Sequence, residues 1–373
     1  MELKDINLTQ NPFQDIIPST EGMEIWAGLK EQKKQITNIY SNAFDRNYRQ
    51  VVLNWGPIGG GKTHAAFYFY KNKLRKLGIS DSQIISVYVR IPKEGKGAGI
   101  QTVRDIFDQI RIEKIINNLN TLNQEKEENY IANELEKEIT SSEAFIDSLV
   151  KLVAPKNNLF GNQQGLIQIF QKYIYDGIST ADAKTLGIAR SLKTMNDYIS
   201  FLGLVLKALT LGGEKHVFLW IDEMEDLLYY PGKEFRQYSQ FIRDLTDSVN
   251  KNMTTFLNFT LTEGEEDSIK HLLGDAMWSR IDSKVRFRDL SVEDVVEYCT
   301  ELINFYQIDK KSELPLSEQV IEYIAKNIPA SSLIPREINK VFRDYIYFIL
   351  ENDIKKPTIN DVKKWQFERH SVT

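Results

Sequence analysis

Short apolar runs alternate with longer amphipathic stretches along the first 290 residues of the chain. The apolar runs are rich in β-branched and aromatic residues, which is typical of buried strands. They cover residues 50–55, 83–91, 216–221 and 254–261, with a shorter candidate at 285–287. Apolar residues at helical spacing predict helices over 24–44, 63–77 and 235–249, and helical patterns with few strand signals fill 101–211. Strands that alternate with helices predict an α/β fold with a parallel sheet.

The pattern changes after Leu290, beyond which only helices are predicted. Ser291 and Asp294 have the spacing of a capping box and indicate a helix start, and further helices are expected over 316–326, 335–350 and 360–367. We therefore expect an α/β domain over residues 1–290, with a helical insertion at about 101–211, and a small all-α lid over 291–373. The insertion is interpreted either as a contact surface for partners or other subunits, or as additional core.

Composition narrows the class of protein. The 373 residues are 42% hydrophobic and 27% charged with a net charge of −5, which is globular and argues against disorder or charge-driven coating of nucleic acid. A single cysteine, Cys299, cannot form an internal disulfide, so a reducing compartment is expected. No basic, apolar leader precedes Pro12, and no apolar run reaches the length of about 18 residues that a membrane helix needs. A cytoplasmic protein that does not span a membrane is the expectation.

Residues 56–63 match the phosphate-binding loop pattern G-x-x-x-x-G-K-[ST], the Walker A motif, at every fixed position. The loop consists of Gly56, Pro57, Ile58, Gly59, Gly60, Gly61, Lys62 and Thr63. Glycines allow backbone N–H groups to turn toward an anion, and the helix that follows presents its positive end to the same anion. Lys62 can then reach the β- and γ-phosphates of ATP, and the Thr63 hydroxyl can coordinate Mg²⁺. His64 comes next and is included among the nucleotide-contacting residues, although a place on the helix fits it better than a role as a base.

The apolar run at 216–221 ends in two adjacent carboxylates, Asp222 and Glu223, as a Walker B motif does. Ligands of open parallel sheets collect at the carboxyl ends of the strands, where this pair lies. Asp222 is expected to order Mg²⁺, and Glu223 is expected to polarise a water for attack on the γ-phosphate. Glu225 and Asp226 are interpreted as a solvated helix start. An acidic pair directly after the strand favours an ATP-hydrolysing class over nucleotide kinases and GTPases.

Together these motifs resemble the AAA+ ATPases, in particular the branch of the origin-recognition initiators and the related STAND and BREX-type ATP-binding proteins. The resemblance covers about 11–367, and the segment 176–228 looks most like the BREX-type proteins. It implies that the lead-in contacts adenine, here through Phe13, Ile16 and Ile17. It also implies a polar sensor near the end of the fourth strand, for which Thr262 is preferred over Thr260 and Asn258.

Two arginines complete the implied site. Trp278-Ser279-Arg280-Ile281 resembles the Ser-Arg-hydrophobic box of the initiator branch, whose arginine reaches the γ-phosphate of a neighbouring subunit. Arg336 starts a lid helix and resembles the second sensor, which contacts phosphate within its own subunit. A planar guanidinium suits the charge that spreads over the γ-phosphoryl group in the transition state. The resemblance thus implies a homo-oligomer with ATP sites at subunit interfaces.

The resemblance has limits, because only about six residues follow Phe367, too few for the winged helix of the initiators or the repeats of STAND proteins. The sequence therefore predicts an AAA+ ATPase that uses ATP and Mg²⁺ to drive assembly or remodelling of a protein or protein–DNA complex, in genome maintenance or anti-phage defence, with a separately encoded protein partner. One alternative is a non-hydrolysing ATP-dependent switch that recruits an effector. Another is an ATPase loaded on DNA through loop lysines such as Lys93 and Lys96.

Overall fold

A central sheet of five parallel strands organises the computed structural model. The model describes residues 1–14, 25–46, 48–70, 83–126, 130–138, 143–153, 163–175, 177–188, 191–211, 216–248, 251–261 and 266–370. The strands are β1 (Gln50–Gly56), β2 (Ile84–Arg90), β3 (His216–Asp222), β4 (Met253–Thr260) and β5 (Ser283–Arg286). Their order across the sheet is β2-β3-β4-β1-β5, and every neighbouring pair is parallel. The carboxyl ends of all five strands therefore lie at one edge, as the prediction of a parallel sheet requires.

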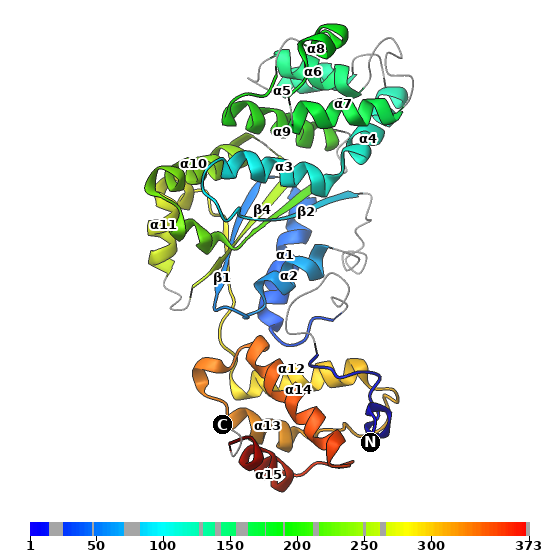
Figure 1. Cartoon of the computed structure of the whole chain (residues 1–373), viewed down its shortest axis with the longest axis vertical. Helices are drawn as coiled ribbons and strands as arrows, with labels where there is room; N and C mark the ends of the chain where they lie inside the picture. Colours follow the sequence, from blue (N-terminus) through cyan, green and yellow to red (C-terminus); the bar gives the residue numbers. More distant parts are fainter. Residues whose placement is uncertain are drawn as a thin grey trace.

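Helices cover both faces of the sheet because alternate strand residues are apolar on both sides (Figure 1). Val51, Leu53 and Trp55 of β1 share an apolar cluster with α3 (Ala98–Ile110), α9 (Met195–Leu209), α10 (Gly232–Ser248) and α11 (Glu266–Trp278). Val52 faces the other way, toward α1 (Lys30–Arg46) and α2 (Lys62–Tyr70). Aromatic rings fill this second layer, where Tyr40 stacks on Phe218 with ring centroids 3.9 Å apart.

The stretch predicted as a helical insertion, at about 101–211, includes most of α3 and all of α9, which share an apolar cluster with the sheet. The helices between them form a lobe beyond α3 and α9, at the end of the molecule away from the lid (Figure 1). Its helices are α4 (Ile112–Glu125), α5 (Tyr130–Glu138), α6 (Glu143–Val153), α7 (Gln163–Tyr175) and α8 (Thr180–Leu186). Their buried side chains belong to the same apolar cluster as one face of the sheet, and Phe201 of α9 packs against Phe145, Phe170 and Tyr173 of the lobe. The lobe is thus an extension of the core, and a role in partner contacts stays a prediction.

The last four helices form a separate apolar cluster at the opposite end (Figure 1). They are α12 (Val292–Tyr306), α13 (Glu318–Lys326), α14 (Pro335–Glu351) and α15 (Ile359–His370). The predicted capping box is present, since the Asp294 N–H donates to Ser291 Oγ (3.1 Å) and the Ser291 N–H to the Asp294 carboxylate (2.9 Å). Ile6, Leu8 and Phe13 from the N-terminal segment, which includes the 3-10 turn η1 (Leu3–Ile6), also belong to this cluster. The N-terminus therefore packs with the lid.

Two local expectations differ from the structure. The helix predicted from residue 24 begins at Lys30, because Gly28 (φ 56°) and Leu29 (φ 46°) are left-handed and the Gly28 N–H bonds to Glu301 of α12. Helix α11 had no prediction, and it is kinked at Gly274. Among the residues that the structure describes, no helix is long and apolar enough to cross a membrane.

Candidate nucleotide-binding site

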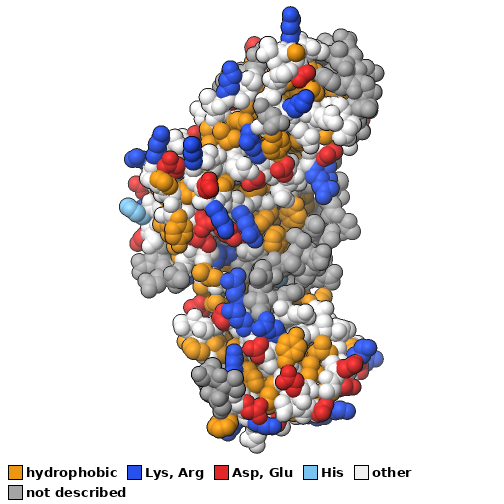
Figure 2. Space-filling model, in the orientation of Figure 1, with side chains coloured by type: hydrophobic (Ala, Val, Ile, Leu, Met, Phe, Trp, Pro, Cys, Tyr) orange, Lys and Arg blue, Asp and Glu red, His pale blue; other side chains and the backbone are white. Residues whose placement is uncertain are grey.

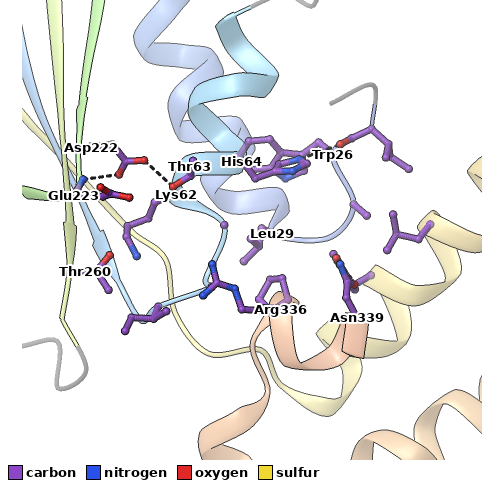
Figure 3. A pocket seen from close by; sticks show the side chains of 18 of the residues that line it. Trp26, Leu29, Lys62, Thr63, His64, Asp222, Glu223, Thr260, Arg336 and Asn339 are labelled. Atoms are coloured by element: carbon purple, nitrogen blue, oxygen red, sulfur yellow. Dashed lines mark hydrogen bonds between the residues drawn. The ribbon is translucent and has the colours of Figure 1, made fainter. Parts of the chain in front are cut away.

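A cavity of about 490 Å³ lies between the carboxyl edge of the sheet and the lid (Figure 3). The phosphate loop and the end of β3 form one end of it, and the segment before α1 together with α12 and α14 forms the other. Besides residues of the phosphate loop and of the segment at the end of β3, the lining includes Pro12, Ile25, Trp26, Ala27, Leu29, Lys93, Thr260, Tyr298, Leu302, Tyr306, Pro335, Arg336 and Asn339. The motifs that are far apart in the sequence thus meet at one place.

The phosphate loop connects β1 directly to α2, as the motif requires. Gly56 (φ 153°) and Gly59 (φ 77°) adopt backbone conformations that other residues rarely reach. A Cβ on Gly56 would lie 2.0 Å from the carbonyl oxygen of Phe287, and one on Gly59 would lie 2.6 Å from Cβ of Arg336. These glycines therefore permit both the turn and the close approach of the lid.

Lys62 is the buried cation of the loop, with 4% of its surface exposed. Its Nζ donates to the carbonyl oxygens of Gly56 (2.9 Å) and Pro57 (2.8 Å). Burial lowers the pKa of Lys62 to about 8, against the opposing effect of the Glu225 and Asp222 carboxylates. An anion in the cavity would supply the negative charge that a buried ammonium favours.

Asp222 and Thr63 have the donor chemistry of a magnesium site. The Thr63 hydroxyl donates to Asp222 Oδ2 over 2.7 Å, and Asp222 is 3% exposed at the end of β3 (Figure 3). A hydroxyl oxygen and a carboxylate in contact, beside a loop that can hold phosphate, are ligands that suit Mg²⁺, which keeps several of its waters. The residues present therefore fit a phosphate-bound magnesium ion.

Glu223 follows in a left-handed conformation (φ 60°), and its backbone N–H donates to Asp222 Oδ1 over 3.0 Å. It precedes the 3-10 turn η4 (Met224–Tyr229), and its side chain lines the cavity. Glu223 Oε1 lies 3.6 Å from Arg90 at the end of β2, a residue that sequence reasoning missed. The partnership depends on β2 lying next to β3, because Arg90 and Asp222 are register partners.

Glu225 is not the solvated residue that was expected. It lines the cavity, and its Oε2 accepts the backbone N–H of Thr260 over 2.9 Å. Burial raises the pKa of Glu225, while this N–H and the charge of Lys62 lower it. Glu225 therefore links the turn after β3 to the end of β4.

The three sensor candidates on the fourth strand have different places. Thr260 ends β4 and lines the cavity (Figure 3). Asn258 lies inside the sheet, where its side-chain oxygen accepts from Asn54 over 3.0 Å. Thr262, the preferred candidate, lies outside the described residues.

The expected adenine contacts are only partly described. Phe13 is fully buried and packs on Phe342 of α14 with ring centroids 5.2 Å apart, so it contributes to the lid core while Pro12 lines the cavity. Ile16 and Ile17 lie outside the described residues. The apolar end of the cavity is instead lined by Trp26, Leu29, Tyr298, Leu302 and Tyr306.

His64 also lines the cavity, next to this apolar end. Its Nε2 lies 3.0 Å from the Ile25 carbonyl, and its ring meets that of Trp26 edge-on at 5.8 Å. Desolvation lowers the pKa of His64 to about 4, so the imidazole is neutral at pH 7. A neutral ring that donates to a carbonyl fits a positioning role on the helix better than that of a base.

Arg336 and Arg280 lie at opposite ends of the strands, Arg336 at the carboxyl ends and Arg280 at the amino ends. Arg336, in the first turn of α14, lines the cavity, and its backbone N–H points to the Gly59 carbonyl at 3.4 Å. Arg280 follows α11 at the amino edge of the sheet, near Asp282, whose N–H bonds to the Val51 carbonyl. Its guanidinium pairs with Asp247 at 2.6 Å, and it does not line the cavity of its own chain.

The strand order, the phosphate loop and the helical lid give the chain the fold of an AAA+ P-loop NTPase, and this fold is similar to that of an ORC protein. Over 96% of the chain and 72% of the other, the structure is similar to the ADP form of the Aeropyrum pernix ORC2 protein, with 11% identity and a TM-score of 0.50. The structure is less similar to Cdc6p from Pyrobaculum aerophilum, with 12% identity over 99% of the chain and 71% of the other and a TM-score of 0.42. Its similarity to a Walker-type ATPase of Pyrococcus abyssi is also weaker, with 12% identity over 90% of the chain and 71% of the other and a TM-score of 0.45. No protein-family model and no curated protein matches the chain. At such identities the likeness establishes the fold alone.

Proposed function

We propose that this protein is a Mg²⁺-dependent ATPase. The observation that carries the proposal is that one cavity collects the phosphate loop, the Asp222–Glu223 pair and Arg336. Lys62 and Arg336 would neutralise phosphate charge, and Thr63 with Asp222 would hold the metal. The apolar end with Trp26 has the character of a site for a nucleobase.

In the proposed reaction, a water molecule attacks the γ-phosphorus of ATP. Glu223 accepts the proton of that water as the new P–O bond forms, and the bond from the γ-phosphorus to the β,γ-bridging oxygen breaks, releasing ADP and inorganic phosphate. Thr63 and Asp222 would hold Mg²⁺, which would supply neutralisation of the phosphate charge. Lys62 stays protonated near an anion, and Arg336 adds a planar cation from the lid.

The ATPase cycle is proposed to move the lid and thereby to assemble or remodel a protein or protein–DNA complex. Arg336 belongs to α14 of the lid, and its backbone approaches the phosphate loop at Gly59. Hydrolysis of ATP in the loop would therefore change the contact between the loop and the lid. The proposal includes a role in genome maintenance or anti-phage defence. It also includes a separately encoded partner and a likeness to BREX-type proteins.

The proposal is tested by the wild-type protein itself. Equilibrium binding of ATP and release of inorganic phosphate are measured with MgCl₂ and with EDTA. We expect binding under both conditions and turnover with Mg²⁺ only. Absence of ATP binding would refute the proposal.

A non-hydrolysing switch is the second candidate function, and the contact between Glu223 and Arg90 at 3.6 Å favours it. An arginine that engages the carboxylate competes with its use as a base. Tight ATP binding without turnover, with or without candidate partners, would support the switch.

We also propose that the protein self-associates when it binds ATP, with Arg280 reaching the site of a second copy. Arg280 and Arg49 both pair with Asp247, at 2.6 and 2.8 Å, so they form a matched pair of variants. We expect Arg280→Ala to lower turnover about tenfold or more and Arg49→Ala to leave it nearly unchanged, because only Arg280 would stabilise the transition state. Mass photometry with a slowly hydrolysed ATP analogue should show dimers or larger assemblies of wild type. A monomer at all concentrations, or equal losses in both variants, would contradict this assignment.

DNA is a further proposed partner. Lys93 lines the nucleotide cavity, so neutralising it would also disturb nucleotide binding. Lys284, Arg286 and Arg288 instead are exposed at alternate positions along the edge strand β5 and beyond it. Figure 2 shows a short run of basic side chains at the waist between the sheet and the lid, and mixed charges over most of the rest of this face.

If DNA binds along this edge, the double variant Arg286→Ala/Arg288→Ala should weaken a salt-dependent mobility shift and reduce its salt slope by about two. Lys96→Ala, in the loop after β2, tests the loop lysines named above as an alternative DNA contact, and a larger loss in that variant than in the double variant would place DNA at the loop instead. No shift for wild type at low salt would exclude DNA as a partner.

A further inference from the structure

Tyr88 lies near the carboxyl end of β2, beside the end of β3. Its phenol oxygen donates to Asp222 Oδ2 over 2.8 Å. The same carboxylate oxygen accepts the Thr63 hydroxyl over 2.7 Å. Two hydroxyls from different elements, α2 and β2, therefore hold one oxygen of the carboxylate that faces the metal site.

The second oxygen of Asp222 is held as well, because Oδ1 accepts the backbone N–H of Glu223 over 3.0 Å. Asp222 is 3% exposed, so water has little access to replace a lost donor. With three donors in fixed places, the carboxylate cannot rotate without breaking a hydrogen bond. Its plane is set before any ligand binds.

The proton of Tyr88 is directed to Asp222 by its other contacts. Arg90 Nε donates to the Tyr88 oxygen over 3.3 Å, so this oxygen acts as the acceptor there and keeps its single proton for the carboxylate. The ring packs on Phe67 of α2 with centroids 4.6 Å apart.

We propose that Tyr88 is a positioning residue for the metal site: its hydroxyl fixes the Asp222 carboxylate in the orientation that a phosphate-bound Mg²⁺ requires. The inference rests on the proposed function, since it assigns a role toward that same ion. Outer-shell hydrogen bonds of this kind hold a ligand in its productive direction, and their loss typically lowers metal affinity about 10–100-fold. Nothing in the phosphate-loop motif or the Asp-Glu pair indicates this tyrosine.

The test is Tyr88→Phe, which removes the hydroxyl and keeps the ring that packs on Phe67. Binding of N-methylanthraniloyl-ATP is followed by fluorescence in EDTA and during titration with MgCl₂. We expect the affinity in EDTA to match that of wild type within about twofold, while the Mg²⁺ concentration at half effect rises about tenfold or more. Tyr70→Phe is the matched control, because its hydroxyl bonds to Gln109 (3.2 Å) away from the site, and it should behave as wild type.

A second experiment asks whether Tyr88 acts through Asp222. In an Asp222→Ala background, adding Tyr88→Phe should change neither binding in EDTA nor the residual effect of Mg²⁺, as expected for a shared pathway. An unchanged Mg²⁺ requirement in Tyr88→Phe would overturn the proposal. So would equal weakening in EDTA and Mg²⁺, or a further shift in the double variant. If wild type binds no nucleotide or shows no Mg²⁺ effect, the proposed function fails and this inference fails with it.

Discussion

Replacing Glu223 by Gln is expected to leave ATP binding intact and to reduce steady-state turnover by about 10²–10⁴-fold, the range that a general base contributes. The amide has the shape of the carboxylate but cannot accept a proton from the attacking water. Glu223 lines the cavity directly after Asp222, at the start of the turn η4. ATP would therefore bind and persist.

The substitution should not unfold the protein. The contact that it removes, with Arg90, joins side chains that are 37% and 55% exposed, and such pairs contribute about 0–1 kcal/mol. Asp226→Asn is the matched control, because it neutralises another carboxylate that lines the same cavity and should keep most turnover. Phosphate release and ATP affinity are measured for both.

If Glu223→Gln keeps its turnover, or if Asp226→Asn loses it instead, Glu223 is not the base. The ATP-trapped Glu223→Gln protein is also the form in which a partner of the ATP state should stay bound. Proteins that co-purify with it and leave on exchange into ADP would identify that partner.

The places of the phosphate loop and of the Asp222–Glu223 pair in the fold could be predicted because each motif is continuous in sequence. Each residue of the phosphate loop serves the same few backbone turns, so the spacing from Gly56 to Thr63 determines the local geometry. The Asp222–Glu223 pair was predictable for a related reason: an apolar strand brings its last residues to the carboxyl edge of the sheet in any parallel arrangement. The strand-and-helix pattern likewise predicted the α/β class that the structure has.

Contacts between elements were not predictable in this way. Tyr88 and Arg90 meet the carboxylates of β3 only because β2 is its neighbour in the order β2-β3-β4-β1-β5. Periodicity identifies strands but does not order them across a sheet. Read alone, the residues at the end of β2 are ordinary strand residues.

The remaining differences come from local backbone geometry that tertiary contacts decide. Apolar spacing predicted a helix through residues 25–29, yet Gly28 is held by Glu301 of the lid and Leu29 adopts a left-handed conformation. Glu225 likewise had the signature of a solvated helix start. Its carboxylate instead points toward the end of β4, where it accepts the hydrogen bond of the Thr260 N–H.

Lys62 is the residue whose loss should weaken ATP binding most. In the structure its Nζ donates to the carbonyls of Gly56 and Pro57. Each of these carbonyls also accepts a backbone N–H, from Leu261 (3.2 Å) and Gly60 (3.1 Å) respectively. Lys62→Ala therefore leaves neither carbonyl without a donor, and the phosphate loop should keep its fold.

We expect Lys62→Ala to lower ATP affinity by about 100-fold or more, since losing even one or two charged hydrogen bonds costs about 3 kcal/mol. The pH dependence gives an independent check. Burial lowers the pKa of Lys62 to about 8, so the ammonium loses its proton as the pH rises through 8, whereas bound polyphosphate favours the charged form. Wild-type affinity should then fall above pH 8, by at most about tenfold per pH unit, while Lys62→Ala should show no such fall. Titration calorimetry between pH 7 and about 9.5 measures the ATP affinity of wild type and of Lys62→Ala. A flat wild-type profile, together with unimpaired ATP binding by the variant, would show that phosphate is held without Lys62.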